Sequence, residues 1–156
     1  MKLLDYTTEA ALLPRQVCPD LGQAVKRLAH AMARAGLVDD AAILARDVLR
    51  REAEGGTALP EGLVLAHARS DAAPAVCLSV ATLTREVPAR GADGEDCQVD
   101  VVVLLTGPAH EQRTLLRLLA RLVRAARAGV LADRLRQAPD RAALARVLAA
   151  VDTEQT

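Results

Sequence analysis

The 156-residue sequence contains no tryptophan, no phenylalanine and a single tyrosine, Tyr6. Its core must therefore be packed from leucine, valine and alanine, and it offers no aromatic surface on which nucleic-acid bases could stack. It also lacks an excess of charge, because 20 basic residues balance 20 acidic ones. Nothing global attracts nucleic acid or an anionic membrane. These absences argue against a nucleic-acid-binding protein.

Cysteines are few, and long apolar runs are missing. Cys18, Cys77 and Cys97 lack the spacing of metal ligands, and no secretory signal is visible, so we expect reduced thiols in a cytoplasmic protein. Cys77 and Cys97 are expected to be buried in strands. No run approaches the ~20 apolar residues of a membrane-spanning helix, so direct membrane insertion is not expected. Neither a metal nor another cofactor is expected.

The chain is expected to form one domain over residues 1–156, with an ordered core over about 3–150 and a short C-terminal tail. Apolar periodicity predicts a helix that is capped by Asp20 and ends at Gly36, and a second helix that begins at Asp39 or Asp40. Strands are expected at residues 10–17, 63–66, 75–83 and 99–105. Helices are expected at 111–128, shortly after Gly129, and at 139–151.

This order of elements predicts an α/β fold, with a central mixed β-sheet flanked by helices on both faces. The run Val101-Val102-Val103 is typical of a strand covered on both sides. It argues against the alternative, an Ala/Leu-rich helical bundle, because successive β-branched residues are poor helix formers.

The most informative motif leads to His67. It begins at Arg51, passes through the loop Gly55-Gly56-Thr57, and continues as the apolar run Leu63-Val64-Leu65-Ala66. An imidazole offers a neutral nucleophilic nitrogen near neutral pH, an arginine offers a planar fork of donors, and glycine lets backbone amides approach an anion. Together these groups suit a phosphoryl group, although a lone histidine is more often a residue satisfied in or near the core.

The pattern resembles the enzyme IIA domain of the mannitol/fructose type in the bacterial phosphoenolpyruvate:sugar phosphotransferase system, a family that includes the nitrogen-regulatory IIA proteins. That family has Arg-Glu, a Gly-Ser-Thr-Gly loop, a glycine, and an apolar run that ends in Pro-His. Here Gly56 stands at the serine position and Ala66 at the proline position. The other matches extend over nearly the whole chain: Arg51, Glu52, Gly55, Thr57, Gly62, Pro74, the turn 91–94, Leu115 and Leu118.

The resemblance implies that His67 accepts a phosphoryl group from an HPr-type phosphocarrier protein. It implies that His67 then passes this group to a IIB domain or, in the nitrogen-regulatory branch, controls binding to regulatory target proteins. Arg51 would stabilise the phosphate, and its guanidinium is expected within side-chain reach of His67 in a shallow surface depression. The resemblance implies supporting roles at the phosphate for Gly55, Gly56, Thr57, Thr114 and Arg69.

One departure from the family concerns a second histidine, which often stands at the start of the late helix. This sequence has Thr114 there, and His110 lies four residues earlier. Without the family, Thr114 is expected to cap the helix. We therefore keep three functions open: a standalone regulatory phosphoryl carrier, a non-catalytic IIA-like interaction module, and a sugar-specific transport IIA that feeds a separate IIB.

Overall fold

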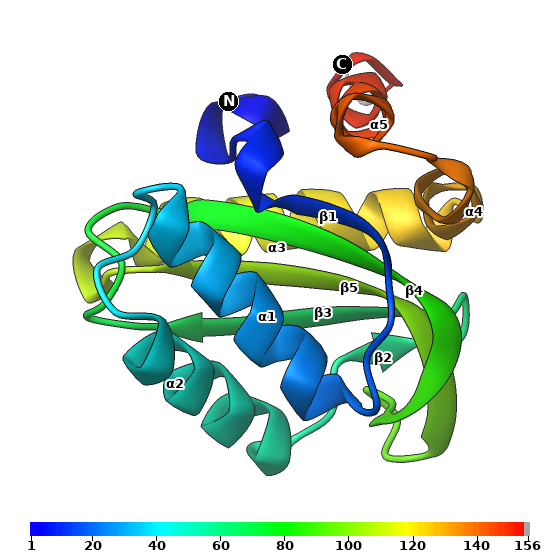
Figure 1. The fold of residues 1–156 in the computed structure, drawn as a ribbon, viewed down its shortest axis with the longest axis horizontal. Helices are drawn as coiled ribbons and strands as arrows, with labels where there is room; N and C mark the ends of the chain where they lie inside the picture. Colours follow the sequence, from blue (N-terminus) through cyan, green and yellow to red (C-terminus); the bar gives the residue numbers. More distant parts are fainter. Residues whose placement is uncertain (155–156) are drawn as a thin grey trace.

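A computed structural model describes residues 1–154 as a five-stranded sheet between two layers of helices (Figure 1). The 3-10 turns and helices are, in chain order, η1 (Leu3–Tyr6), η2 (Glu9–Ala11), α1 (Leu21–Arg34), α2 (Ala41–Glu54), η3 (Ala109–Glu111), α3 (Gln112–Arg127), α4 (Leu131–Gln137) and α5 (Arg141–Glu154). The strands are, in chain order, β1 (Leu12–Gln16), β2 (Ala58–Leu59), β3 (Leu63–Arg69), β4 (Cys77–Arg90) and β5 (Asp96–Gly107). Of the tail expected after residue 150, residues 155 and 156 lie outside this description.

The strands follow the spatial order β1-β4-β5-β3-β2. β1 pairs with β4 and β3 with β5 in parallel, whereas the β4–β5 and β2–β3 pairs are antiparallel. The predicted mixed sheet with helices on both faces is confirmed, and the alternative prediction of a helical bundle is wrong. β1 lies at one edge of the sheet.

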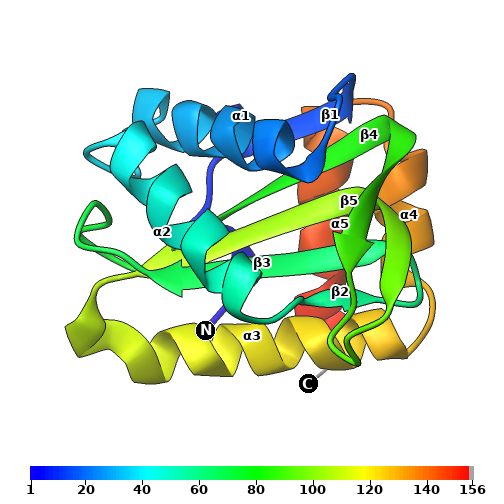
Figure 2. The ribbon, with the colours of Figure 1, turned by 90° about the horizontal axis from the view of Figure 1, so that it is seen from below.

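Two separate apolar clusters cover the two faces of the sheet. α1 and α2 pack on one face, and α3, α4 and α5 pack on the other (Figure 2). β5 supplies both clusters, with Val102 on the α1–α2 side and Val101 and Val103 on the opposite side. Alternate residues of a strand point to opposite faces, which explains why a strand covered twice is apolar at every position.

The ends of the first two helices follow their local sequence signals. The Asp20 carboxylate accepts a hydrogen bond from the Gln23 amide at 2.7 Å, and Asp40 accepts one from the Ile43 amide at 3.0 Å. These are N-cap bonds, which satisfy amides that the helix itself leaves unpaired. Gly36 follows α1 with φ +78°, a conformation that side chains disfavour. The predicted start and end of α1 are confirmed.

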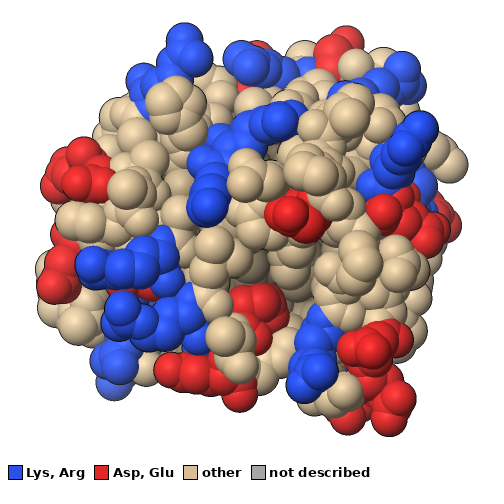
Figure 3. Space-filling view, turned by 60° about the horizontal axis from the view of Figure 1, so that its bottom comes forward, with Lys and Arg blue, Asp and Glu red and all other residues tan. Residues whose placement is uncertain are grey.

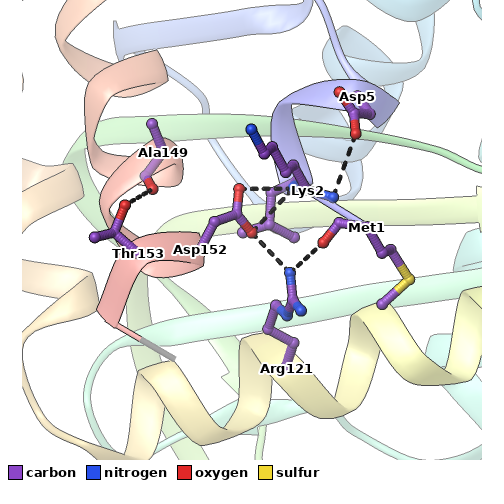
Figure 4. Close-up of polar contacts among 8 residues, drawn as sticks. Met1, Lys2, Asp5, Arg121, Ala149, Asp152 and Thr153 are labelled. Atoms are coloured by element: carbon purple, nitrogen blue, oxygen red, sulfur yellow. Dashed lines mark hydrogen bonds and ion pairs between the residues drawn. The ribbon is translucent and has the colours of Figure 1, made fainter. Parts of the chain in front are cut away.

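The N-terminal turn is fastened to the helices on the α3 side of the sheet (Figure 4). The Asp152 carboxylate accepts a hydrogen bond from the Leu3 amide at 2.9 Å and an ion-pair bond from the Arg121 guanidinium at 2.8 Å. Arg121 also donates to the Met1 carbonyl. This network joins η1, α3 and α5, and it lies away from His67. No helix within residues 1–154 has both the length and the apolar character needed to cross a membrane.

Candidate functional site

His67 lies near the end of β3, in a half-buried position. Leu63 and Leu65 of this strand pack with the α3–α5 cluster, whereas Val64 and Ala66 pack with the α1–α2 cluster. The alternation of strand side chains therefore places His67 on the α3 side. The buried start of β3 fixes the strand, so the histidine is presented from a rigid element.

A single hydrogen bond sets the protonation pattern of the ring. The His67 Nδ1 atom lies 2.7 Å from the Leu65 carbonyl oxygen. A carbonyl can only accept, so Nδ1 must carry the proton. In the neutral ring this leaves the lone pair on Nε2. The arrangement provides one nucleophilic nitrogen and holds it in a defined orientation.

The outer edge of β3 is only briefly covered by another strand. β2 pairs with it through Ala58–Val64 and Leu59–Leu63, and the Leu65 amide then donates to the Thr57 carbonyl at 3.3 Å. The sequence analysis missed β2, because a two-residue strand forms only through its partner.

Arg51 reaches this edge from α2, which packs on the other face of the sheet. Its Nη1 atom donates to the Gly55 carbonyl at 2.8 Å. This bond holds the guanidinium against the loop that leads into β2. Arg51 and His67 approach this edge from opposite faces of the sheet, and their direct proximity stays a prediction.

Thr57 is tied to Glu52, a residue that the sequence analysis left out of the site. The Thr57 hydroxyl lies 2.5 and 3.1 Å from the two Glu52 carboxylate oxygens and donates its proton to that group. The hydroxyl thus holds the loop through Glu52, and its predicted contact with a phosphate stays a prediction. Glu52 directly follows Arg51 in the motif. This Arg-Glu pair is the sequence signal that could have identified Glu52 as a site residue.

Gly56 is required by close packing. A Cβ atom at this position would lie 2.1 Å from the Arg90 carbonyl oxygen and 2.7 Å from the Arg90 Cβ atom. The end of β4 therefore presses directly on the loop. This contact gives a physical reason for glycine where the resembling family has serine.

A surface cavity of about 630 Å³ opens beside this edge. Four arginines line it, together with the acidic residues Asp47, Glu54 and Asp71; the arginines are Arg46, Arg50, Arg51 and Arg69. Figure 3 shows basic side chains grouped at the lower left of the view, with acidic side chains beside them. The structure thus brings Arg51 and Arg69 together in one cavity, whose lining residues do not include His67.

Arg69 connects this cavity to the start of α3. Its Nη1 atom donates to the Gln112 side-chain oxygen at 3.3 Å. Gln112 is the first residue of α3, and Thr114 follows in the same turn. Gln112, Arg46 and Arg50 were not predicted as site residues, because only the fold brings them to the end of β3.

The expectation that Thr114 caps α3 is wrong. The 3-10 turn η3 leads directly into the helix, so Glu111 occupies the capping position and Thr114 lies inside the first turn. The Glu111 carboxylate accepts a bond from the Val76 amide at 2.8 Å instead of capping the helix. Thr114 is half-buried, and His110 is exposed in η3.

The cysteines and acidic residues contribute no further site. Within residues 1–154, no group of three or more His, Cys, Asp or Glu side chains is placed to hold a metal. Burial raises the pKa of the Cys77 thiol to about 12. Cys97 is half-exposed rather than buried, because it lies in the part of β5 that extends beyond the covered sheet.

Comparisons with known proteins agree with the fold. A family model described as "Phosphoenolpyruvate-dependent sugar phosphotransferase system, EIIA 2" matches residues 6–151. A relative from Escherichia coli (strain K12), the PTS system 2-O-alpha-mannosyl-D-glycerate-specific EIIABC component, is 33% identical over 114 residues. The match covers 73% of this chain but only 17% of the relative's length.

Solved structures show the same fold at low sequence identity. The nitrogen regulatory protein IIA-Ntr from Neisseria meningitidis is 14% identical with a TM-score of 0.81, over 92% of this chain and 97% of its own. IIA mannitol from Escherichia coli is 16% identical with a TM-score of 0.73, over 91% and 98%. The IIA chain in a complex with phosphorylated IIB mannitol, also from Escherichia coli, is 14% identical with a TM-score of 0.69, over 90% and 95%.

Proposed function

Since this chain belongs to the EIIA 2 family of the phosphoenolpyruvate-dependent sugar phosphotransferase system, we propose that it carries a phosphoryl group on His67. The observation that carries the proposal is the bond from Nδ1 to the Leu65 carbonyl, which leaves the Nε2 lone pair free. The position of the ring supports it too, because β3 is barely paired along this edge and a partner protein can approach it.

In the proposed reaction, Nε2 attacks the phosphorus atom of a phosphorylated HPr-type carrier. The bond from Nε2 to phosphorus forms as the donor's bond to phosphorus breaks, and the donor keeps that electron pair. Positive charge then develops on the His67 ring, and the Leu65 carbonyl stabilises it through the Nδ1 proton. Phosphoryl transfer asks the protein mainly for positioning and charge stabilisation, and no metal is required in this scheme.

Arg51 would neutralise the transferred group. It now donates to the Gly55 carbonyl, and a short movement of its flexible side chain would let the guanidinium meet phosphate oxygens instead. Arg69 and the backbone amides of Gly55 and Gly56 would complete the contacts. Glu52 would act through Thr57 as a positioning residue, because it fixes the loop that carries these amides.

Two kinds of partner could receive or respond to the phosphoryl group on His67. One candidate is a regulatory, nitrogen-type role in which phosphorylation of His67 changes the binding of target proteins. A second candidate, transfer to a sugar-specific IIB domain, is favoured by the 33% identity to the mannosylglycerate-specific relative. Incubating the phosphorylated protein with a IIB domain separates the two, since only the transport role requires loss of the phosphoryl group to IIB.

Intact-mass measurement tests the carrier itself. After incubation with phosphoenolpyruvate, enzyme I and HPr, the protein should gain one phosphoryl group, and His67→Ala should gain none. His110→Ala is the matched control, because His110 is exposed in η3 and should leave the gain intact. No gain under conditions that phosphorylate another IIA protein would sink the proposal and favour the non-catalytic interaction module.

A further inference from the structure

A second cavity, of about 320 Å³, lies at the opposite edge of the sheet from His67. It opens between α1, the edge strand β1 with the preceding turn η2, and the first turn of α5. We call it the β1-edge pocket. Its charged and titratable lining residues are Arg27, His30, Arg34 and Arg141.

The charged side chains that line the β1-edge pocket are all basic. No aspartate or glutamate lines it, whereas three acidic residues line the cavity beside Arg51. Arg27, His30 and Arg34 stand at positions i, i+3 and i+7 of α1, which places them along one face of that helix. Arg141 comes from the other end of the chain. The fold thus gathers three guanidinium groups and an imidazole that the sequence keeps apart.

These cations are not used to hold the protein together. Within residues 1–154 none of the three arginines forms an ion pair, and the Arg34 and Arg141 side chains form no hydrogen bond either. Arg27 is the exception, since its Nη1 atom donates to the Val17 carbonyl at 3.0 Å and to the Gln16 side-chain oxygen at 3.3 Å. These bonds fix one guanidinium at the rim and leave its other donors available.

The number of basic side chains suits a phosphate group better than a carboxylate. A phosphate monoester presents three terminal oxygens, and the pocket is lined by three arginines from two helices. The volume is at the lower end of the range for small-molecule sites. The remaining lining, which includes Ala10, Leu13 and Ala31, is apolar enough to contact an uncharged body.

We propose that the β1-edge pocket binds a small phosphorylated molecule, which contacts Arg27, Arg34 and Arg141 through its phosphate. This site is separate from the phosphoryl-acceptor site and does not depend on the function proposed for His67.

Calorimetric titration of the whole protein with inorganic pyrophosphate, at about physiological ionic strength, tests the assignment. We expect saturable binding at one site, weakened about tenfold by Arg34→Gln and again by Arg141→Gln, since each removes a charged contact to phosphate. Neither side chain has a folding partner, so both variants should stay folded. Arg124→Gln, an exposed charge on α3 outside this pocket, and Arg46→Gln, from the cavity beside Arg51, should bind like the wild type.

Four results would overturn the proposal. The first is the absence of saturable binding at this ionic strength. The second is an equal loss in Arg124→Gln, which would mean that only general surface charge attracts the probe. The third is binding of citrate that is as tight as binding of pyrophosphate, because the pocket would then select negative charge rather than phosphate. The fourth is loss of binding in Arg46→Gln, which would place the probe in the cavity beside Arg51.

Discussion

Two adjacent glycines allow a sharp test of how the loop before β3 is seated. Replacing Gly56 with serine introduces a Cβ atom that would lie 2.1 Å from the Arg90 carbonyl oxygen and 2.5 Å from its carbon. At Gly55 the nearest atom to such a Cβ is Arg51 Nη1, at 3.8 Å, and the backbone is extended with φ 178°. The same substitution thus clashes at one position and fits at the next.

The expected cost follows from the contacts that must separate. The loop and the end of β4 would have to move apart by roughly 1 Å to restore ordinary contact, which is typical of overpacking that costs about 1–3 kcal/mol. The movement would also strain the bond from the Ala92 amide to the Ala58 carbonyl, now 3.1 Å long, at about 1 kcal/mol. Gly56→Ser should therefore lower the free energy of unfolding by about 2–4 kcal/mol, and Tm by roughly 5–15 °C.

Thermal and urea unfolding of Gly55→Ser and Gly56→Ser measure this difference directly. Gly55→Ser should stay within about 0.5 kcal/mol of the wild type. If Gly56→Ser unfolds at the wild-type midpoint, the loop does not press on Arg90 as described, and the physical reason given for glycine at this position is wrong. If both variants lose equal stability, the loss arises from the loop as a whole rather than from the contact.

Two further predictions concern side chains around the same sheet. Thr57→Val should slow phosphorylation of His67 several-fold and lower the free energy of unfolding by about 1 kcal/mol, because it breaks the bond to Glu52. Thr57→Ser should restore both the phosphorylation rate and the stability. A wild-type phosphorylation rate in Thr57→Val would exclude a positioning role for the Thr57–Glu52 bond. The Cys77 thiol, with its pKa raised by burial from 9.0 to about 12, should make stability fall as pH rises from about 9 toward 12, because the unfolded thiol ionises first. Urea unfolding across this pH range should show a shallower fall in Cys77→Ala, and an identical pH dependence would refute the assignment.

Local signals in the sequence predicted the parts of the fold that depend on near neighbours. Asp20 and Gly36 bound α1 because a cap and a positive φ act within one turn of the helix. β4 runs past the expected Leu83 because its exposed continuation is held by pairing with β5, after a register shift between Thr82 and Val87. A polar hairpin of this kind carries no apolar alternation, so only the partner strand reveals it.

The candidate site shows the same limit more clearly. The motif predicted which residues could contribute to the site. It did not predict that Arg51 extends from a helix on the opposite face of the sheet from His67. Their predicted proximity depends on topology, because β2 begins only at Ala58 and the loop before it holds the Arg51 guanidinium through the Gly55 carbonyl. A longer β2 would pair with the backbone at His67 and leave less room for a partner protein. The shortness of β2 is therefore a structural requirement of the proposed carrier, and Gly56 permits it by letting the loop lie against Arg90.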